Sequence, residues 1–399
     1  MSELKKTTLG ELIEFQRGYD LPKNSFREGN IPVISSNGIL GFHNVSKVKG
    51  PGITIGRSGT VGLPHYIEKD FFPHNTALFI KDFKGNYPEY IYYLLKTLGL
   101  NDRGSGSGVP TMNRNHLHPL EVIAHLDLST QQKIAAVLST LDAKIALNNR
   151  INAELEAMAK TLYDYWFVQF EFPSPQPPEG ANKAENFPLW GQGGYKTSGG
   201  AMVWNEDLKR EIPEGWEVGE LKDIANITMG QSPPGESYND TGEGMIFFQG
   251  CTDFGTRFPS VRQFTTSPTR FAKKGDILLS VRAPVGTINI AKEDCCIGRG
   301  LAAMNSKSKF DTFLYGVLQN LKQIFDRRNV DGTTFGSITK DDLFSLSVIV
   351  PDDDILAKYQ EIVNPAFEKQ NEIAMENQQL SALRDWLLPM LMNGQVVVE

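Results

Sequence analysis

The sequence predicts an α+β fold in which two globular mixed α/β domains are separated by two long antiparallel coiled-coil helices. Three observations predict it: a heptad pattern in the middle of the chain, a second one at its end, and an internal repeat that makes the second half a copy of the first. The chain has 399 residues, 40% hydrophobic and 22% charged, which is typical of a globular protein with two or three domains.

The central heptad pattern runs from Ser129 to Trp166 without a Gly or Pro. Apolar residues alternate at spacings of four and three, which predicts a coiled-coil seam; Asn148 and Asn152 occupy two seam positions and would fix the register. Ser129 or Thr130 is expected to cap the start of this helix. The seam residues are Ile134, Leu138, Leu141, Ile145, Asn148, Asn152, Leu155, Ala159, Leu162 and Trp166.

The same plan returns between Ile355 and Met392. The predicted stripe consists of Tyr359, Ile362, Ala366, Ile373, Leu380, Leu383 and Leu387. Because short strings such as Asn149-Arg150-Ile151 and Asn371-Glu372-Ile373 align between the two stretches, the helices are interpreted as copies. A single helix this long needs a partner, so the two are expected to pack antiparallel.

The segments between the helices alternate short β-like runs with Gly, Pro and Asn clusters. They also repeat each other at an offset of about 224 to 228: Leu9–Leu12 matches Val218–Leu221, Ile53–Gly62 matches Ile277–Gly286, and Gly106–Thr111 matches Asp331–Gly336. The repeated Leu-Gly-Glu-Leu and Val-Gly-Glu-Leu strings are expected to open a strand. The predicted boundaries are residues 1–127, a helix over 128–170, a Pro- and Gly-rich linker over 171–217, a second domain over 218–353, and a helix over 354–392.

Charge alone leaves nucleic-acid binding open. The net charge is −7, yet residues 1–127 carry 14 Lys and Arg against 12 Asp and Glu, and residues 218–350 carry 15 against 14, so the acid lies on the helices and linker. The three cysteines are too few for a disulfide framework, which favours a reducing cytoplasm. No signal peptide and no apolar run of membrane-spanning length is expected.

Three motifs resemble the DNA-specificity subunit of type I restriction-modification systems. They are the closing pattern from Asn371 to Gln395, the Leu-Tyr-Asp-Tyr-Trp-Phe-Val-Gln-Phe ending of the central helix, and the Ile-Pro-Glu-Gly-Trp-Glu lead-in to the second domain. The resemblance covers the whole chain. It implies two target recognition domains that each read one half of an asymmetric bipartite double-stranded DNA site. One departure is that the first domain begins almost at Met1, without the Pro-x-Gly-Trp lead-in.

The resemblance also implies partners and cofactors. The two helices would set the spacing of the half-sites and dock two modification methyltransferase subunits, to which restriction subunits attach. S-adenosylmethionine, ATP and Mg are expected on those partner subunits, with no cofactor and no catalytic residue on this chain. The aromatic anchors expected to face the methyltransferases are Tyr163, Tyr165, Trp166, Phe167 and Trp386. Equally, these rings could seal the helix ends against the globular domains.

Candidate DNA contacts lie in loops that match between the two repeats. Arginines after a β run can reach guanine edges or phosphates, and short amides and hydroxyls suit both bases and phosphates. In the first domain the candidates are Gln16, Arg17, Tyr19, Ser36, Asn37, Arg57, Ser58, Asn75, Thr111, Asn113 and Arg114. In the second domain they are Gln231, Ser232, Gln249, Thr252, Arg282, Arg299, Thr333, Thr334 and Lys340.

Enzyme and metal hypotheses find little support in the sequence. No amino-methyltransferase motif and no Walker-type phosphate loop is present; Ser232-Pro233-Pro234-Gly235 lacks the aromatic residue the methyltransferase motif needs. All six histidines precede residue 127, but none forms a pair with helical ligand spacing and a carboxylate, so no metal site is predicted. The alternative to DNA recognition is a scaffold that holds protein partners at a fixed separation without reading DNA.

Overall fold

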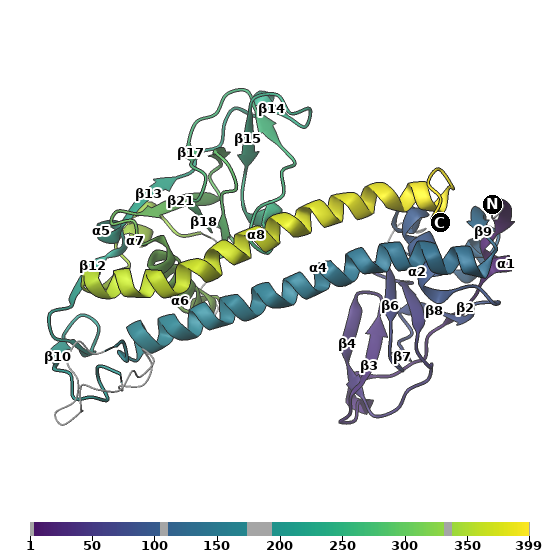
Figure 1. The fold of residues 1–399 in the computed structure, drawn as a ribbon, viewed down its shortest axis with the longest axis horizontal. Helices are drawn as coiled ribbons and strands as arrows, with labels where there is room; N and C mark the ends of the chain where they lie inside the picture. Colours follow the sequence, from purple (N-terminus) through teal and green to yellow (C-terminus); the bar gives the residue numbers. More distant parts are fainter. Residues whose placement is uncertain (1–3, 104–110, 174–193, 331–336, 399) are drawn as a thin grey trace. The chain divides into compact units, whose positions relative to one another are not determined.

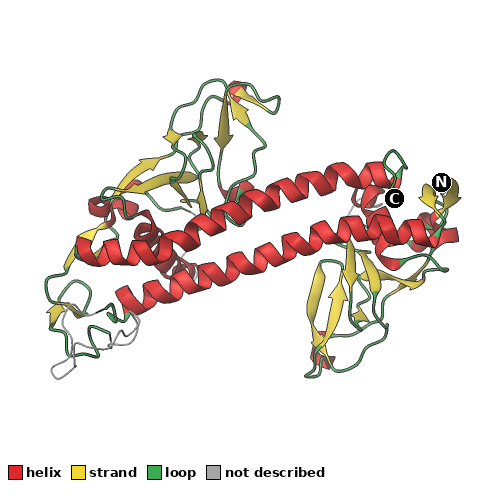
Figure 2. Ribbon diagram, viewed as in Figure 1, coloured by secondary structure: helices red, strands yellow, loops and turns green. Residues whose placement is uncertain are grey.

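The computed structural model describes residues 4–103, 111–173, 194–330 and 337–398. The chain divides into two compact units, Met1–Leu147 with Asn377–Glu399, and Asn148–Glu376. Each unit contains one mixed α/β head and about half of each of two long helices, α4 (Leu128–Tyr163) and α8 (Asp353–Met392) (Figures 1 and 2). This confirms the predicted fold class of two mixed α/β domains and two long helices.

The first head, residues 4–125, contains three small sheets. Their strand orders are β1-β9, β2-β8-β5-β6 and β4-β3-β7, and all pairings are antiparallel except β3 with β7. The strands are β1 (Leu4–Thr8), β2 (Glu14–Arg17), β3 (Ile31–Ser35), β4 (Gly38–His43), β5 (Gly52–Gly56), β6 (Pro64–Ile67), β7 (Phe72–Pro73), β8 (Ala77–Asp82) and β9 (Glu121–His125), and the helices are α1 (Leu9–Leu12), α2 (Pro88–Thr97) and α3 (Arg114–Leu117).

The second head, residues 217–350, repeats this topology. Strand order β13-β21-β18-β19 matches β2-β8-β5-β6, β12-β22 matches β1-β9, and the parallel pair β15 with β20 matches β3 with β7. The strands are β12 (Glu217–Glu220), β13 (Ala225–Met229), β14 (Tyr238–Asn239), β15 (Met245–Phe248), β16 (Phe264–Thr265), β17 (Phe271–Ala272), β18 (Ile277–Ser280), β19 (Ile288–Ile290), β20 (Cys295–Ile297), β21 (Leu301–Ser306) and β22 (Ser347–Val350), and the helices are α5 (Leu221–Ile224), α6 (Asp311–Val330) and α7 (Lys340–Phe344).

The repeated Leu-Gly-Glu-Leu string forms a single helical turn, α1, rather than the expected strand. Thr8 and Glu11 form a capping box: the Thr8 hydroxyl accepts a hydrogen bond from the Glu11 backbone at 3.3 Å, and the Glu11 carboxylate accepts one from the Thr8 backbone at 3.0 Å. The helix α5, which follows β12, begins in the same way, with Glu220 and Asp223 as the box. The Val-Gly-Glu-Leu string lies mostly in β12, as expected of a strand, so the match of Leu9–Leu12 with Val218–Leu221 is displaced by three residues. The cap satisfies the free N–H groups of the turn, and this local preference outweighs the short apolar run.

Residue Asp127, not Ser129 or Thr130, caps the start of α4. Its carboxylate accepts hydrogen bonds from the backbone N–H and the hydroxyl of Thr130, both at 2.8 Å. These bonds hold the pKa of Asp127 below its usual value. A carboxylate at a helix N-terminus also interacts favourably with the helix dipole, so the acid is the better cap at this position.

Within each unit, α4 and α8 pair antiparallel along the predicted seam. In the first unit Ile134 and Leu138 are buried together with Leu388 and Leu391, and in the second unit Tyr359 donates to the carbonyl of Ala159 at 3.5 Å. One stripe residue, Leu383, is exposed, whereas Leu387 is half-buried against the core that contains Leu388 and Leu391.

The two polar seam positions are packed where the sequence places them. Asn148 is buried and donates from Nδ2 to the Glu376 carboxylate at 2.7 Å. The Gln370 amide, also buried, donates to the carbonyl of Asn152 at 3.1 Å. The bond between Asn148 and Glu376 can form in only one register of the two helices, so this pair favours the observed alignment. The buried side-chain oxygens of Asn152 and Gln370 have no hydrogen-bond partner among the described residues.

The end of α4 leads into an aromatic cluster and a short hairpin. A π-helical turn, Asp164–Val168, is followed by Phe172, whose ring stacks between Tyr195 at 4.6 Å and Trp216 at 4.9 Å. The hairpin of β10 (Met202–Asn205) and β11 (Arg210–Pro213) then returns the chain to the second head. The predicted linker is therefore tied down at both of its described ends.

Candidate nucleic-acid interface

In the first head, backbone hydrogen bonds gather the loops that follow β2, β3, β5 and β7. We call this set of bonds the loop frame. Arg57 N–H donates to Thr76 O at 2.8 Å, which ties the loop after β5 to the turn before β8. The other members are Gly18 N to Ala77 O (3.0 Å), Tyr19 N to Pro73 O (2.8 Å), His74 N to Ile34 O (2.8 Å) and Met112 N to Arg57 O (2.8 Å).

The second head contains the same loop frame, bond for bond. Its members are Gly230 N to Leu301 O (2.9 Å), Gln231 N to Ile297 O (3.0 Å), Gly298 N to Phe248 O (2.8 Å), Val281 N to Gly300 O (2.9 Å) and Ile338 N to Val281 O (2.8 Å). The frame therefore defines equivalent residues in the two heads without reference to side chains. Tyr19 corresponds to Gln231, Ser35 to Gln249, Ser58 to Arg282 and Asn75 to Arg299.

A glycine is required at one position of the frame. A Cβ on Gly18 would lie 2.1 Å from the carbonyl oxygen of His74, and a Cβ on Gly230 would lie 2.1 Å from that of Gly298. Any side chain would force the loops apart. The close approach holds the residues that follow, Tyr19 and Gln231, at the mouth of the loops.

Six of the first head's predicted residues line one cleft of about 550 Å³. They are Gln16, Arg17, Tyr19, Arg57, Asn113 and Arg114, and the cleft also includes Asp20. Arg17 Nη2 lies 3.0 Å from Asp20 Oδ1, and Arg57 Nη1 lies 3.5 Å from the carbonyl oxygen of Asn75. The sequence hypothesis did not include Asp20; its place directly after Tyr19 in a matched loop is the signal that could have suggested it.

The remaining first-head candidates lie on loops next to this cleft. Thr60 donates from its hydroxyl to the Asn37 amide oxygen at 3.5 Å, and the Ser36 backbone N–H donates to Thr76 Oγ1 at 3.3 Å. Ser58 and Thr111 face each other in an antiparallel bridge. The hydroxyl and amide groups predicted from matched loops are therefore brought together in space.

In the second head, Ser232, Gln249 and Arg299 form a compact polar group. Gln249 Nε2 lies 2.9 Å from Ser232 Oγ, and the Arg299 backbone N–H donates to the same hydroxyl at 3.3 Å. Gln231 and the exposed Arg299 side chain flank this group. Thr252 is exposed on a 3-10 turn, Cys251–Asp253, which the Gly250 backbone links to Gln249.

The two predicted loop arginines, Arg57 and Arg282, occupy neighbouring rather than equivalent positions of matched loops. The loop frame aligns Arg57 with Val281 and Ser58 with Arg282, because Val281 makes the bond to Gly300 that Arg57 makes to Thr76. Arg282 instead pairs with Ser337 in the bridge that corresponds to Ser58 with Thr111. The two arginines thus leave neighbouring positions of equivalent loops.

Arg114 and Lys340 are equivalent first residues of α3 and α7. Asn113 caps α3 by accepting from the Asn115 backbone at 3.0 Å, and Thr339 caps α7 by accepting from the Asp342 backbone at 3.2 Å. Both basic side chains are exposed. Thr333 and Thr334 lie outside the described residues, as does most of the Gly106–Thr111 and Asp331–Gly336 match.

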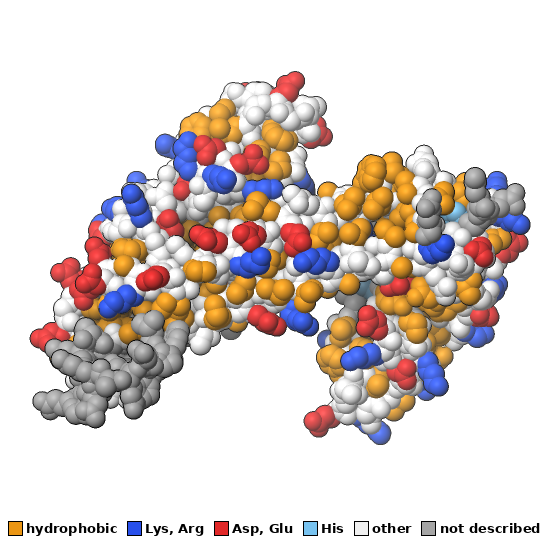
Figure 3. Space-filling view, in the orientation of Figure 1, with side chains coloured by type: hydrophobic (Ala, Val, Ile, Leu, Met, Phe, Trp, Pro, Cys, Tyr) orange, Lys and Arg blue, Asp and Glu red, His pale blue; other side chains and the backbone are white. Residues whose placement is uncertain are grey.

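Charge on the heads is mixed rather than uniformly basic. Basic and acidic side chains are intermingled on the face shown in Figure 3. In the first-head cleft, however, Arg17, Arg57 and Arg114 outnumber Asp20. The local balance suits the approach of a phosphate backbone, although the net charge of the chain is negative.

Each head is tied to α4 through one acidic side chain. In the first unit Asp142 accepts from the Tyr93 hydroxyl of α2 at 2.8 Å and from Arg384 of α8 at 2.7 Å. Burial, with the Asp142 carboxylate nearby, raises the pKa of Tyr93. In the second unit Glu156 accepts from Gln319 of α6 at 2.6 Å. These contacts join each head to the helix on which it sits.

Three of the five predicted partner anchors are buried, which corrects that prediction. Tyr163, Trp166 and Phe167 are 7%, 1% and 3% exposed, and they pack in the core of the second unit with Phe313 and Tyr359. They seal the helix end against the head, the alternative that the sequence had left open. Tyr165 and Trp386 are 38% and 56% exposed and remain candidate partner contacts.

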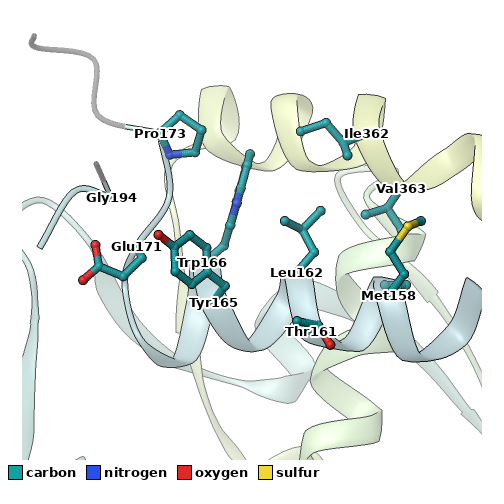
Figure 4. Close-up of a pocket in the computed structure, with 11 residues that line it drawn as sticks. Met158, Thr161, Leu162, Tyr165, Trp166, Glu171, Pro173, Gly194, Ile362 and Val363 are labelled. Atoms are coloured by element: carbon teal, nitrogen blue, oxygen red, sulfur yellow. The ribbon is translucent and has the colours of Figure 1, made fainter. Parts of the chain in front are cut away.

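A shallow apolar hollow of about 400 Å³ lies beside Tyr165 in the second unit. Figure 4 shows around it Met158 and Leu162 from the end of α4, Trp166 from the π-helical turn that follows, and Ile362 and Val363 from α8. Its walls are mainly carbon, with the Glu171 carboxylate at one side. Such a surface suits packing by an apolar side chain better than binding of a nucleic acid.

Several histidines have structural partners. Phe15 N–H donates to His118 Nε2 at 3.0 Å, and Arg27 N–H donates to His43 Nδ1 at 3.1 Å. Burial, with the charges of Arg114 and Lys84, lowers the pKa of His118, in keeping with a neutral ring that accepts. Within the described ranges, no three His, Cys, Asp or Glu side chains gather in a way that could hold a metal ion.

Among the helices of the described residues, none is both long enough and apolar enough to cross a bilayer.

Comparison with known proteins gives these heads a family. A family model described as "Type I restriction modification DNA specificity domain" matches residues 1–157 and again residues 213–383. The putative type I restriction enzyme MjaX specificity subunit of Methanocaldococcus jannaschii is 30% identical over 324 residues, 78% of this chain and 69% of that protein. The MjaIX specificity subunit of the same organism is 29% identical over 336 residues, 79% of this chain and 70% of that protein.

A solved structure shares the fold. The crystal structure of a type I restriction-modification system S subunit from M. genitalium superposes with a TM-score of 0.61 at 17% identity, covering 98% of this chain and 96% of that one. With the family match over both heads, and with 30% identity to a specificity subunit over more than two thirds of each sequence, the chain belongs to the type I restriction-modification DNA specificity family.

Proposed function

We propose that this chain selects the DNA target of a type I restriction-modification complex, each head reading one half of an asymmetric bipartite site in double-stranded DNA. The observation that carries the proposal is the loop frame. Two heads hold equivalent loops with the same backbone bonds but present different side chains, such as Tyr19 and Gln231 or Asn75 and Arg299. A constant frame with variable side chains is what two readers of different sequences require.

The helices would set the separation of the half-sites. Support comes from each unit by itself, where α4 and α8 pair through a buried seam and the head is joined to α4 through Asp142 or Glu156. A head fixed to a helix pair moves with it, so the length of the pair would determine which DNA spacing both heads can reach at once.

The proposed partners are two modification methyltransferase subunits, with restriction subunits joining through the complex. Exposed aromatic rings on the helices, Tyr165 and Trp386, are the contacts we propose for the methyltransferases. Methylation and cleavage would then be catalysed by the partners, which would also bind S-adenosylmethionine, ATP and Mg. A cytoplasmic location follows from this proposal, because the DNA substrate is there.

Modified-base sequencing tests the whole proposal. Genomic DNA from cells that express this chain with its methyltransferase is compared with DNA from cells that lack only this chain. We expect a split, asymmetric motif that is methylated only when the chain is present. Methylation that does not depend on the chain would instead support a protein scaffold that does not read DNA.

Charge reversal separates DNA recognition from the scaffold alternative at the level of residues. Arg57→Glu and Arg282→Glu place a carboxylate where a guanidinium faces the proposed DNA, so each should weaken binding of the cognate site by about tenfold or more. Lys69→Glu is the control, because Lys69 is an exposed residue of the first head outside the cleft. Equal binding by all three variants of the methyltransferase complex would favour the scaffold.

A further inference from the structure

Asp20 is an acidic residue that lines the first-head cleft, whose other charged residues are Arg17, Arg57 and Arg114. Its Oδ1 atom accepts hydrogen bonds from Arg17 Nη2 at 3.0 Å and from the Asn75 amide. These two donors come from different segments, the end of β2 and the turn before β8, so they fix the orientation of the carboxylate. Among the described residues, no hydrogen bond reaches the other oxygen, Oδ2, and the side chain is exposed.

The contacts with Asn75 and Arg17 also keep the Asp20 carboxylate negatively charged. The hydrogen bond from Asn75, helped by the Arg17 charge, lowers the pKa of Asp20 below its usual value. The group is therefore ionised at neutral pH and can act only as a hydrogen-bond acceptor. A carboxylate repels DNA phosphates, so it reduces non-specific affinity and gains a role in binding only where it faces a donor on a base edge.

The loop frame marks this position as variable between the heads. Asp20 follows Gly18 and Tyr19 as Ser232 follows Gly230 and Gln231. The second head therefore has a serine hydroxyl where the first has a carboxylate, and this hydroxyl accepts from Gln249 Nε2 at 2.9 Å and from the Arg299 backbone N–H at 3.3 Å. The backbone is the same and the hydrogen-bonding character differs, as expected of a residue that determines specificity.

In the major groove, the donors on base edges are the exocyclic amino groups of cytosine (N4) and adenine (N6), whereas guanine O6 and thymine O4 are acceptors. We propose that Asp20 is a specificity-determining residue of the first head, whose Oδ2 accepts a hydrogen bond from the amino group of a cytosine or an adenine on one DNA strand. This inference rests on the proposed function. Arg17 and Asn75 act as positioning residues that hold the carboxylate toward that base.

The test deletes the amino group and the carboxylate separately and together. The complex of this chain with its methyltransferase is bound to its cognate duplex, in which each adenine of the first half-site is replaced in turn by purine and each cytosine by 2-pyrimidinone. These analogues lack only the amino group. For the wild-type chain, one substitution should weaken binding about 5- to 100-fold; which analogue does so tells adenine from cytosine.

In Asp20→Ala the same analogue should weaken binding of the duplex less than about twofold, because the acceptor is already absent. The charge control is Glu121→Gln, which removes an exposed carboxylate of the first head paired with Lys6 and should keep the wild-type sensitivity. An equal loss for wild type and Asp20→Ala would show that Asp20 does not contact the amino group.

If Asp20→Ala fails to assemble, the wild-type scan still decides. A scan in which no amino deletion in the first half-site weakens binding overturns the inference and leaves the proposed function intact. A wild-type complex that selects no bipartite site at all would contradict the proposed function itself, so the two failures can be told apart.

Discussion

At position 230 two segments of backbone approach so closely that only a hydrogen atom fits between them. A Cβ there would lie 2.1 Å from Gly298 O and 2.8 Å from Leu301 O, and Leu301 O accepts the loop-frame bond from the Gly230 N–H. We expect Gly230→Ala to destabilise the second head by about 1–3 kcal/mol, because the loops must separate. The measurement is thermal unfolding combined with binding of the second half-site.

Gly235→Ala provides the matched control for that variant. Gly235 lies five residues further along the same segment, and a Cβ there would meet no atom within 4 Å. It should therefore keep both stability and binding. If Gly230→Ala also behaved like wild type, the close approach of the loops would not be needed for recognition.

His118 gives the first head a dependence on pH. Its Nε2 accepts the Phe15 N–H, and burial, with Arg114 and Lys84 nearby, lowers its pKa below the usual 6.5. A histidine whose pKa is lower in the folded state than in the unfolded state binds a proton more weakly when the protein is folded. Protonation at low pH therefore lowers the free energy of unfolding. This contribution to stability is complete above pH 6.5 and is lost as the pH falls from 6.5 through the lowered folded-state pKa.

The variant His118→Gln should flatten this dependence. Glutamine offers an amide oxygen that can accept the Phe15 N–H but does not titrate. Thermal midpoints measured between pH 7.5 and pH 5 should therefore fall less steeply in the variant than in the wild type. Parallel curves for the two proteins would mean that His118 contributes nothing to the acid sensitivity.

At the scale of helices and strands, the second head contacts α8 through the buried guanidinium of Arg257. Arg257 lies between the rings of Tyr315 on α6 (5.4 Å) and Phe367 on α8 (4.6 Å), and its Nε donates to Asn371 at 2.9 Å. Burial lowers the pKa of Arg257, while the Tyr315 and Glu156 groups oppose this shift. The loop that carries Arg257 is thus locked between two helices.

Replacing Arg257 with methionine should loosen that contact. Methionine fills much of the volume but leaves Asn371 without its donor, so we expect a destabilisation of about 2–4 kcal/mol and weaker reading of the second half-site. Arg257→Lys keeps the charge and should recover part of the loss. Methylated motifs provide the readout: degeneracy is expected in the second half only, and unchanged motifs would contradict a positioning role for Arg257.

Sequence patterns predicted the long elements better than the short ones. The helices α4 and α8 follow from heptads that no Gly or Pro interrupts, and the paired heads follow from the repeat of strings such as Ile53–Gly62 and Ile277–Gly286. The turn α1 was mistaken for a strand because its formation depends on one capping box, Thr8 with Glu11, which outweighs four residues of apolar pattern.

The candidate site divides in the same way. Six of the residues predicted from matched loops line one cleft, and their contact with DNA stays a prediction. The burial of Tyr163, Trp166 and Phe167 could not be predicted, because an aromatic ring at a helix end satisfies a head or a partner equally well by composition. Asp20 was not predicted, because an acidic residue repels DNA phosphates and is a poor candidate on sequence grounds. Only the structure shows that Arg17 and Asn75 donate hydrogen bonds to it and orient it.

For the whole molecule, the repeat places the proposed base recognition in the heads and the proposed spacing of the half-sites in the helix pair. Each unit contains a complete head and its own portion of both helices, and the unit boundaries fall between Leu147 and Asn148 in α4 and between Glu376 and Asn377 in α8. Residues inserted at both boundaries would extend the helix pair without entering either head. The proposed function then predicts a change in the DNA spacer with both half-sites unchanged.

Three heptads inserted at both boundaries form the sharpest test of this idea. A multiple of seven keeps the seam in phase, and 21 residues lengthen a helix by about 32 Å, close to one turn of B-DNA at about 34–36 Å. The heads would then meet the same face of the duplex, and DNA selected by the complex should show a spacer about 9–10 base pairs longer.

One heptad adds only about 10 Å, roughly three base pairs, which turns the second half-site by about 100° and should weaken binding. When three heptads are inserted in α4 alone, the inserted segment has no matching segment of α8 to pair with. This variant should therefore not select a bipartite site. If the spacer stayed constant in the doubly extended chain, the helices would not be the element that measures the DNA.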